Sequence, residues 1–386
     1  MKKKVTKDPN KISSGIYIHI PFCIVKCMYC DFYSVNDREN LIPQFINSLK
    51  LEIEQCKVDT KDWNIETIFI GGGTPSLIKS KYIEIIINAL NKKHKLNNIK
   101  EFTIESNPGE APKNRLKNYH DLGIDRISIG IQSLEPSILK FLTRIHDSKQ
   151  VFDTFYNARE VGFNNINCDL IYSIPNQTWD IWYRDLKKII NLNPEHISAY
   201  TLTSEKGTEL YKSIKNQNII MPNDDQTSNW FLKTHKILKS FNYKSYEISN
   251  FSKTNYKCLH NLNYWKNKPY IGYGPSAHSY DGYKRWSNIR SIDSYIKKIK
   301  SFKSPISFSE TLTIENKINE LIGFGLRTSS GISIKNIPEP FINKFYRNLE
   351  SALIKWENCI SLNKNFVKLK NQGFLYGDSI AIDLMI

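Results

Sequence analysis

The sequence has no long apolar segment. No run approaches about 18 uninterrupted apolar residues, the length that a membrane-spanning helix needs, so no transmembrane segment is expected. The basic stretch at residues 1–14 is not followed by an apolar run of the signal-peptide type, because residues 16–22 contain a histidine and lead into cysteines. The chain also has no internal repeat and no long low-complexity linker. These absences predict a globular protein of the cytoplasm.

Acidic residues are few relative to basic ones. The chain has 54 Lys and Arg residues against 38 Asp and Glu residues, which gives a formal net charge of +16. Such an excess is typical of proteins that bind nucleic acids or other acidic ligands. The lysines are spread along the chain, however, even in stretches such as NKKHKLNNIK (91–100), and no recognition motif accompanies them. A solvated basic surface explains this charge, so we expect no nucleic-acid partner and keep a nucleic-acid-binding module only as an alternative.

Six apolar, strand-like runs alternate with amphipathic helical stretches in the first 205 residues. The runs are GIYIHI (15–20), IETIFI (65–70), EFTIES (101–106), DRISIGIQS (125–133), NINCDLIYS (165–173) and HISAYTLT (196–203). This rhythm predicts a parallel sheet with right-handed helical crossovers, either a partial (β/α)6 barrel or a flat doubly wound sheet. We expect an N-terminal tail at 1–14, an α/β barrel at 15–245 and a smaller, mixed or helical C-terminal domain at 246–386, since 386 residues exceed one ordinary core.

Unusual residues fall at the ends of successive predicted strands. A cysteine loop follows the first strand and GGGTPS (71–76) follows the second. Glu105 and Asn107 end the third strand, Gln132 ends the fourth, and Asp169 lies within the fifth. Because the carboxyl ends of parallel strands meet at one edge of a sheet, these residues are expected to share one pocket.

Three cysteines stand within eight residues, and no fourth is nearby. Cys23, Cys27 and Cys30 follow the spacing C-x3-C-x2-C, which in a reducing cytosol favours a metal site over disulfides. A structural zinc ion takes four ligands, and the next candidates, Asp31 and His19, lack the usual spacing. Three thiolates are able to hold three irons of a 4Fe–4S cluster and leave the fourth iron open. The amino and carboxylate groups of S-adenosylmethionine fit such an open iron.

Two of these stretches resemble a known superfamily. YIHIPFCIVKCMYCDF (17–32) is similar to the cluster loop of radical SAM proteins, and GGGTPS is similar to their glycine-rich cofactor stretch. The resemblance implies that Gly72, Gly73 and Thr74 lie against the methionyl group of the cofactor. It also places Tyr17, Tyr29, Glu105, Gln132, Arg144 and Asp169 near the amino acid or ribose of the cofactor. The alternative for each polar residue alone is a buried, satisfied group at a strand end.

Further motifs resemble one branch of this superfamily. GIQSL (130–134), DLIYSIP (169–175) and YEISNF (246–251) are similar to the group that contains oxygen-independent coproporphyrinogen dehydrogenase and the HemW-type haem chaperones. The dehydrogenase has a further cysteine two residues after the third, where this chain has Phe32. Ser173 and Asn176 replace glycines that are usual in the family, which predicts a stiffer or shifted turn after the fifth strand.

The stretch HNLNYW (260–265) resembles the haem-associated motif of the chaperones. The resemblance implies that the imidazole of His260 binds haem iron, with Tyr264 and Trp265 as flat apolar surface. Cys258 and His278 are second candidates. Without the resemblance, a capping or surface histidine beside a core tryptophan is the simpler interpretation of His260.

The sequence thus predicts a haem chaperone on a radical SAM core, with a 4Fe–4S cluster, S-adenosylmethionine and haem as cofactors. Its implied partners are a haem-acceptor protein and an electron donor for the cluster. No catalytic residue is assigned, since the chaperone role is favoured over an enzymatic one. Oxidative decarboxylation of coproporphyrinogen is the alternative activity.

Overall fold

A single large β-sheet organises most of the chain. The computed structural model describes residues 11–386, and its main sheet has 12 strands in the order β12-β11-β10-β9-β1-β2-β3-β4-β5-β6-β8-β7. Strands β1 to β6 are parallel neighbours and coincide with the six expected runs. They are β1 (Ile12–Ile20), β2 (Trp63–Gly72), β3 (Glu101–Ser106), β4 (Arg126–Gln132), β5 (Ile166–Tyr172) and β6 (His196–Thr201). Residues 1–10 of the expected tail lie outside the described residues, and residues 12–14 belong to β1.

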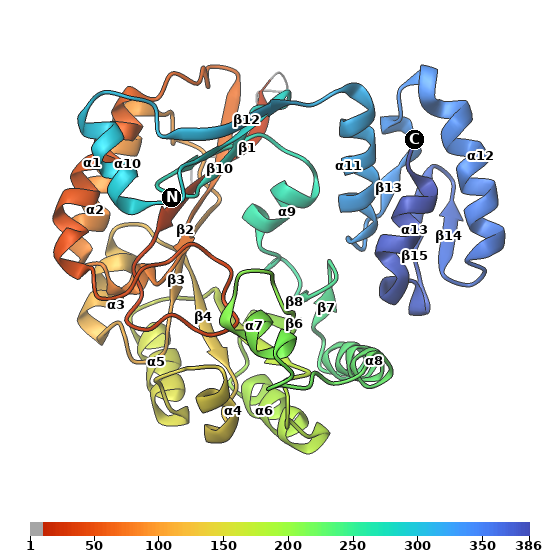
Figure 1. The fold of residues 1–386 in the computed structure, drawn as a ribbon, viewed down its shortest axis with the longest axis horizontal. Helices are drawn as coiled ribbons and strands as arrows, with labels where there is room; N and C mark the ends of the chain where they lie inside the picture. The colour runs from red at the N-terminus through yellow and green to blue at the C-terminus, as the bar shows by residue number, and fades with distance from the viewer. Residues whose placement is uncertain (1–10) are drawn as a thin grey trace.

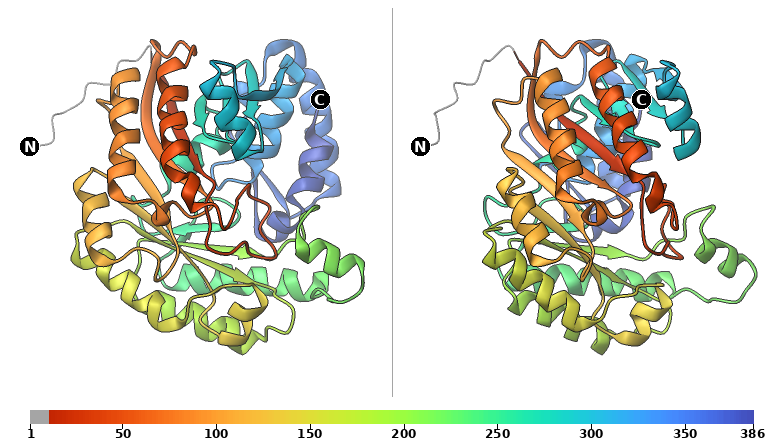
Figure 2. Two further views of the ribbon diagram at one scale, coloured as in Figure 1. Left: turned by 60° about the vertical axis from the view of Figure 1, so that its left-hand side comes forward. Right: turned by 90° about the vertical axis from the view of Figure 1, so that its left-hand side faces the viewer.

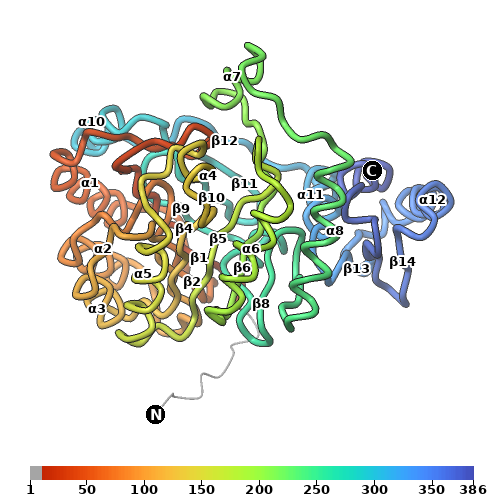
Figure 3. Tube along the Cα trace, turned by 90° about the horizontal axis from the view of Figure 1, so that it is seen from below, coloured from red at the N-terminus to blue at the C-terminus, as the bar shows by residue number. Residues whose placement is uncertain are grey.

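Helices cover the outer face of this parallel sheet. They are α1 (Ile42–Gln55), α2 (Ser80–Lys93), α3 (Lys113–Asp121), α4 (Pro136–Phe141), α5 (Ser148–Glu160) and α6 (Trp179–Asn191). Figures 1 and 3 show them side by side along the outside of the curved sheet. The sheet stays open, because β12 and β7 are its two edges. The crossover helices lie on one face of β1–β6 and a cavity lies on the other, whereas a doubly wound sheet has helices on both faces, so the expected partial (β/α)6 barrel is confirmed.

Side chains of the parallel strands alternate between the two faces of the sheet. On β1, Ile16, Ile18 and Ile20 are fully buried beneath the outer helices, whereas Tyr17 and His19 point to the inner face. The same two-residue period repeats on the next strands, because successive side chains of a strand point to opposite faces. Isoleucine thus forms the layer against the helices, and the chemically reactive residues are left on the inside.

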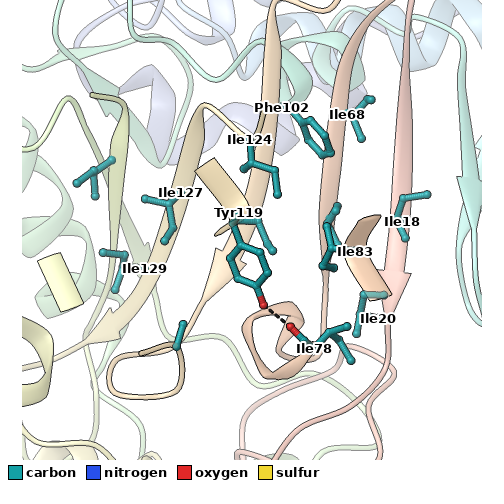
Figure 4. Close-up of a cluster of buried hydrophobic side chains, with 14 of the residues drawn as sticks. Ile18, Ile20, Ile68, Ile78, Ile83, Phe102, Tyr119, Ile124, Ile127 and Ile129 are labelled. Atoms are coloured by element: carbon teal, nitrogen blue, oxygen red, sulfur yellow. Dashed lines mark hydrogen bonds between the residues drawn. The ribbon is translucent and has the colours of Figure 1, made fainter. Parts of the chain in front are cut away.

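Aliphatic packing between sheet and helices is reinforced by buried hydroxyls. Figure 4 shows Ile18, Ile20, Ile68 and Ile83 packed against one another, with Tyr119 of α3 among them. The Tyr119 hydroxyl donates a hydrogen bond to the carbonyl oxygen of Ile78, in the loop before α2. A buried phenol with its hydrogen bond made adds apolar area without an unpaired polar atom.

Residues 205–312 extend the same sheet at both ends. The added elements are α7 (Glu209–Lys215), α8 (Asp224–Ser240), β7 (Lys244–Ser245), β8 (Asn250–Ser252), α9 (Leu259–Trp265), β9 (Tyr270–Tyr273), β10 (His278–Tyr280), β11 (Lys284–Asn288), α10 (Ile292–Lys300) and β12 (Ile306–Thr311). Strand β9 pairs in parallel with β1, and Tyr273, Tyr295 and Ile299 belong to the main hydrophobic core. The domain boundary expected at residue 246 would cut through this sheet, so we propose a boundary near residue 312 instead.

The remaining residues form a small unit with its own core. It contains α11 (Ile314–Leu326), β13 (Ile332–Ser333), α12 (Glu339–Lys355), β14 (Ile360–Asn363), β15 (Phe366–Leu369) and α13 (Gly377–Leu384). The three strands make a separate sheet, and a hydrophobic cluster from Ile318 to Leu384 joins it to the helices. Figures 1 and 2 show this unit, coloured blue, beside the open inner side of the main sheet. Within residues 11–386, no helix has the length and apolar character needed to cross a membrane.

The turn after β5 keeps a glycine-like conformation without glycine. Ser173 has a φ of 57° and Asn176 a φ of 63°, both in the left-handed region that side chains other than Gly and Asn rarely adopt. Ser173 therefore holds a strained conformation in this turn, and the expectation of a stiffer or shifted turn than in the family stays a prediction. Ser173 is 1% exposed, and its hydroxyl has no hydrogen-bond partner among the described residues.

We predict that Ser173→Gly stabilises the protein by about 1 kcal/mol. The change relieves the left-handed strain and removes a buried, unpaired hydroxyl, which outweighs the greater flexibility of glycine in the unfolded chain. Urea unfolding of parent and variant measures the difference. Asn176→Gly is the control and is expected to change stability far less, because Asn176 is exposed and asparagine tolerates this conformation. Equal stability of Ser173→Gly and parent would contradict the account of this turn.

Candidate cluster and cofactor site

One cavity of 1440 Å³ on the inner side of the sheet gathers the residues that the sequence singled out. It is lined by Tyr17, Cys23, Cys27, Tyr29, Cys30, Gly72, Gly73, Thr74, Glu105, Gln132, Arg144, Asp169 and His260. Most of them lie on β1–β5 or on the loops that follow these strands, whereas Arg144 lies between α4 and α5 and His260 reaches the cavity from α9. The second candidates His278 and Cys258 line it too.

The cysteine loop is fixed to the strand ends by backbone hydrogen bonds. Gly73 N donates to Ile20 O at 2.7 Å and Thr74 N donates to Phe22 O at 2.7 Å, so the glycine loop and the cysteine loop are joined edge to edge. Cys23 N donates to Val35 O at 3.0 Å, which closes the cysteine loop at its base. The three cysteines are free thiols held in one short loop at the mouth of the strands.

Two of the three sulfur atoms receive hydrogen bonds from residues of neighbouring loops. The Thr74 hydroxyl donates to Cys23 Sγ at 3.6 Å, and Arg144 Nη1 donates to Cys27 Sγ at 3.7 Å. Burial raises the pKa of Cys23 above its usual value and raises the pKa of Cys30 to about 11. Bound iron would favour the thiolate forms of these cysteines, because its positive charge opposes the effect of burial. Hydrogen bonds to sulfur are also a means by which proteins tune iron–sulfur clusters.

The arrangement differs from a closed zinc site. Within residues 11–386, no group of three or more His, Cys, Asp or Glu side chains is arranged to hold a single metal ion. His19, a possible fourth ligand by sequence, has both ring nitrogens in hydrogen bonds, to the Tyr17 hydroxyl at 3.0 Å and the Tyr33 carbonyl oxygen at 2.7 Å. Asp31 instead contacts Arg290, whose Nη2 donates to the Asp31 backbone oxygen.

Glycine is required where the two loops meet. A Cβ on Gly73 would lie 2.6 Å from Phe22 O and 3.0 Å from Cys23 Sγ. A Cβ on Gly72, which has a φ of +114°, would meet the ring of His19. The glycines leave their backbone open to the cavity beside the cysteines, which is the surface that a cofactor bound next to the cluster would need.

Carboxylates stand on the inner face next to this glycine loop. Gly72 N donates to Glu105 Oε2 at 3.0 Å. Desolvation, and then the charge of Asp169, raise the pKa of Glu105 to about 7. Asp169 accepts hydrogen bonds from the Ser128 hydroxyl and the Asn167 amide, both at 2.8 Å. A bound cation such as the ammonium of an amino acid would favour the ionised form of Glu105.

Arg144 connects the cysteine loop to β4. Its Nη2 donates to Gly130 O at 2.6 Å and to Asn107 Oδ1 at 2.5 Å. The register of β4 on β5 shifts between Gly130 and Gln132, and Gln132 has a φ of 66°, so this irregularity aims Gln132 into the cavity.

Glu110 is a neighbour of these groups that the sequence did not single out. It accepts a hydrogen bond from the side-chain amide of Asn107 at 3.1 Å. No pattern in the sequence pointed to it, since it lies in the loop after β3.

His260 lies in the cavity wall with both ring nitrogens already bonded. Nδ1 hydrogen-bonds with the Thr67 hydroxyl at 2.8 Å and Nε2 with the Tyr264 hydroxyl at 2.9 Å. Burial, and then the charge of Arg126, lower the pKa of His260 to about 3, so the ring is neutral. Binding of iron by Nε2 would require the Tyr264 bond to break. Cys258 is buried, and its thiol donates to Glu101 at 3.4 Å.

Comparison with known proteins identifies the family. The family profile of the Radical SAM superfamily matches residues 17–189. The heme chaperone HemW of Bacillus subtilis is 32% identical over 371 residues, which cover 94% of this chain and 97% of the relative. The chain belongs to the HemW family. HemW of Escherichia coli is 36% identical over 266 residues, covering 68% of this chain and 69% of the relative.

A solved structure matches the fold almost throughout. HemN of Escherichia coli, described as a coproporphyrinogen III oxidase and radical SAM enzyme, superposes with a TM-score of 0.85 at 21% identity, covering 97% of this chain and 91% of that one. At this identity the likeness concerns the fold alone. Membership of the radical SAM superfamily implies a 4Fe–4S cluster and S-adenosylmethionine. The free thiols, the donors to sulfur and the open glycine backbone fit both groups.

We predict that Gly73→Ala prevents cluster assembly in this HemW-family protein. The new Cβ would collide with the backbone of Phe22 and with Cys23. Moving backbone atoms costs more free energy than moving the end of a flexible side chain. Iron and sulfide content after anaerobic reconstitution is the measurement, with circular dichroism to check folding. Gly323→Ala is the matched control, because its Cβ would meet only Met385 Cε at 3.8 Å. Full iron content in Gly73→Ala would show that the loop contact is not needed.

Proposed function

We propose that this protein is a haem chaperone, which binds haem and transfers it to an acceptor protein from a radical SAM core. The observation that carries the proposal is that three cysteines and a wall of aromatic side chains line one and the same inner cavity. Near-complete coverage of a heme chaperone by this chain supports the proposal.

Cys23, Cys27 and Cys30 are the proposed ligands of the cluster. When bound, a 4Fe–4S cluster supplies one electron and an open iron for an exchangeable ligand. Thr74 and Arg144 would stabilise the thiolates through the hydrogen bonds that they already donate to sulfur. The partly buried guanidinium of Arg144 also brings positive charge to a site that gathers negative sulfur.

S-adenosylmethionine is proposed to lie along the ends of β2 to β5. Gly72 and Gly73 would present backbone groups to its methionyl part, since no side chain stands in the way. Glu105 would accept a hydrogen bond from the ammonium, and Asp169 and Gln132 would bind ribose hydroxyls, since all three line the cavity. Tyr17 and Tyr29 would close the two sides of this pocket, as both line the cavity.

The cavity has room for a second ligand. Typical small-molecule sites occupy roughly 300–1,000 Å³, and this cavity measures 1440 Å³. The wall away from β3–β5 is rich in aromatic rings, among them Phe69, Tyr264, Trp265 and Tyr270. Flat aromatic surface suits a porphyrin, so we propose that haem binds in this part of the cavity. His260 would then support the wall through its bond to Tyr264.

Oxidative decarboxylation of coproporphyrinogen is the second candidate activity, because HemN has the same fold. The residue in the place of the extra cysteine of that enzyme is Phe32, whose side chain is 67% exposed. No thiol at this position is therefore available for the decarboxylation.

The cysteine loop also presents an apolar surface. Ile24, which is 42% exposed, lies in this loop, as Phe32 does, and offers that surface to the proposed electron donor or haem acceptor.

We predict that Cys27→Ala removes the cluster and leaves the fold intact. Loss of one thiolate leaves two ligands for three irons, so the charge-transfer absorbance after anaerobic reconstitution should disappear. Iron and sulfide analysis gives the occupancy. Cys359→Ala is the control, since Cys359 lies in the C-terminal unit and does not line the cavity. Equal iron content in the two variants would contradict the ligand assignment.

A haem titration of the reconstituted parent tests the proposed function itself. We expect saturable binding of one haem per chain, followed by loss of haem to an added haem-free acceptor. The same sample, supplied with S-adenosylmethionine, a reductant and coproporphyrinogen, should yield no vinyl product. Absence of haem binding together with vinyl formation would replace the chaperone by the dehydrogenase.

A further inference from the structure

One face of the sheet extension carries a group of side chains of which only Tyr270 has so far been given a part in the proposed site. Tyr280 of β10 pairs with Tyr270 of β9 and with Arg285 of β11, so these three side chains project from the same face. His278 lies two residues before Tyr280 on β10 and therefore shares that face. All four residues line the cavity. We call them the β9–β11 face.

His278 differs from the other two histidines that line the cavity. His19 and His260 each have both ring nitrogens hydrogen-bonded within the protein. The imidazole of His278 has no side-chain hydrogen bond to any residue in 11–386, and it is exposed to the cavity. An axial ligand needs an accessible nitrogen lone pair. Among these three histidines, only His278 has a ring nitrogen that is able to bind iron without the loss of a hydrogen bond.

Burial and the charges around His278 favour the neutral form of its ring. Burial, and then the nearby guanidinium groups of Arg285 and Arg290, lower its pKa below the usual value. The cationic neighbours are themselves partly compensated: Arg285 contacts Glu310 and Glu320, and Arg290 contacts Asp31. A neutral imidazole with cations beside it suits a metal complex whose edge carries carboxylates.

The sheet order separates this face from the proposed cofactor pocket. Strands β9, β10 and β11 lie on one side of β1, and β3 to β5 lie on the other. Tyr270 and Tyr280 are flat rings beside the imidazole, and Tyr264 packs edge-on against Tyr270 with ring centroids 4.6 Å apart. A planar ligand on the β9–β11 face would thus lie beside the cofactor pocket rather than inside it.

We infer that His278, rather than His260, presents the axial imidazole to haem iron, with Tyr270 and Tyr280 against the porphyrin and Arg285 near its carboxylates. This inference rests on the proposed haem-binding function and assigns its ligand. His260 is then a positioning residue: its Nε2 holds the hydroxyl of Tyr264, and the ring of Tyr264 contacts Tyr270.

Haem titration of full-length variants, followed by absorbance spectroscopy, tests the assignment. His278→Ala should weaken haem binding by about tenfold or more and lose the spectrum of imidazole-ligated haem, which added free imidazole should restore. His260→Gln keeps hydrogen-bonding atoms next to Thr67 and Tyr264 and should retain the ligated spectrum. His120→Ala, in α3 and outside the cavity, is the control for loss of a histidine and should match the parent.

The outcomes separate this inference from the function on which it rests. Haem binding by the parent, with an unchanged spectrum in His278→Ala and a lost one in His260→Gln, overturns the assignment of His278 but preserves the chaperone. No haem binding by the parent overturns both. Loss of the ligated spectrum in His278→Ala alone, with recovery in imidazole, supports the assignment, because a merely structural defect would not be repaired by a free ligand.

Discussion

The whole site depends on the two-residue alternation of six parallel strands. Ile16, Ile18 and Ile20 on β1 are fully buried under α1 and its neighbours, and this apolar layer fixes which face of each strand is turned inward. A shift of one residue in register would bury Tyr17 and His19 against helices and expose isoleucine to the cavity. Hydrophobic burial on the outer face therefore sets the position of every polar group on the inner face. The chemistry of the site is a consequence of packing on the opposite side of the sheet.

Local sequence patterns are enough to predict the six parallel strands, the loops at their ends and the site formed by the three cysteines. These features depend on short-range patterns: apolar runs, a glycine loop and a fixed cysteine spacing. The bonding state of His260 could not be predicted, since its partner Thr67 lies 193 residues away in the sequence. The resemblance pointed to His260, and only the fold shows that both of its nitrogens are engaged.

The domain boundary illustrates the same limit. Strands β9 to β11 have only three to five residues each, so they give weak periodic signals and were not recognised. Their place in the main sheet follows from the pairing of β9 with β1, which joins Gly15 to Tyr270 across most of the barrel sequence. The β9–β11 face exists only through this long-range pairing. The sequence therefore does not predict this face, although it offers His278 as a second candidate ligand.

We propose that β1 divides the inner face of the sheet into two parts. One part is a cofactor pocket beside the cysteines, and the other is a separate haem surface. The most direct measurement is the dissociation constant of haem for the cluster-loaded chain, with and without saturating S-adenosylmethionine. The account predicts that both ligands bind together and that the haem constant changes by less than about twofold. Displacement of haem in proportion to the S-adenosylmethionine bound would show that the two ligands share one pocket, and would contradict it.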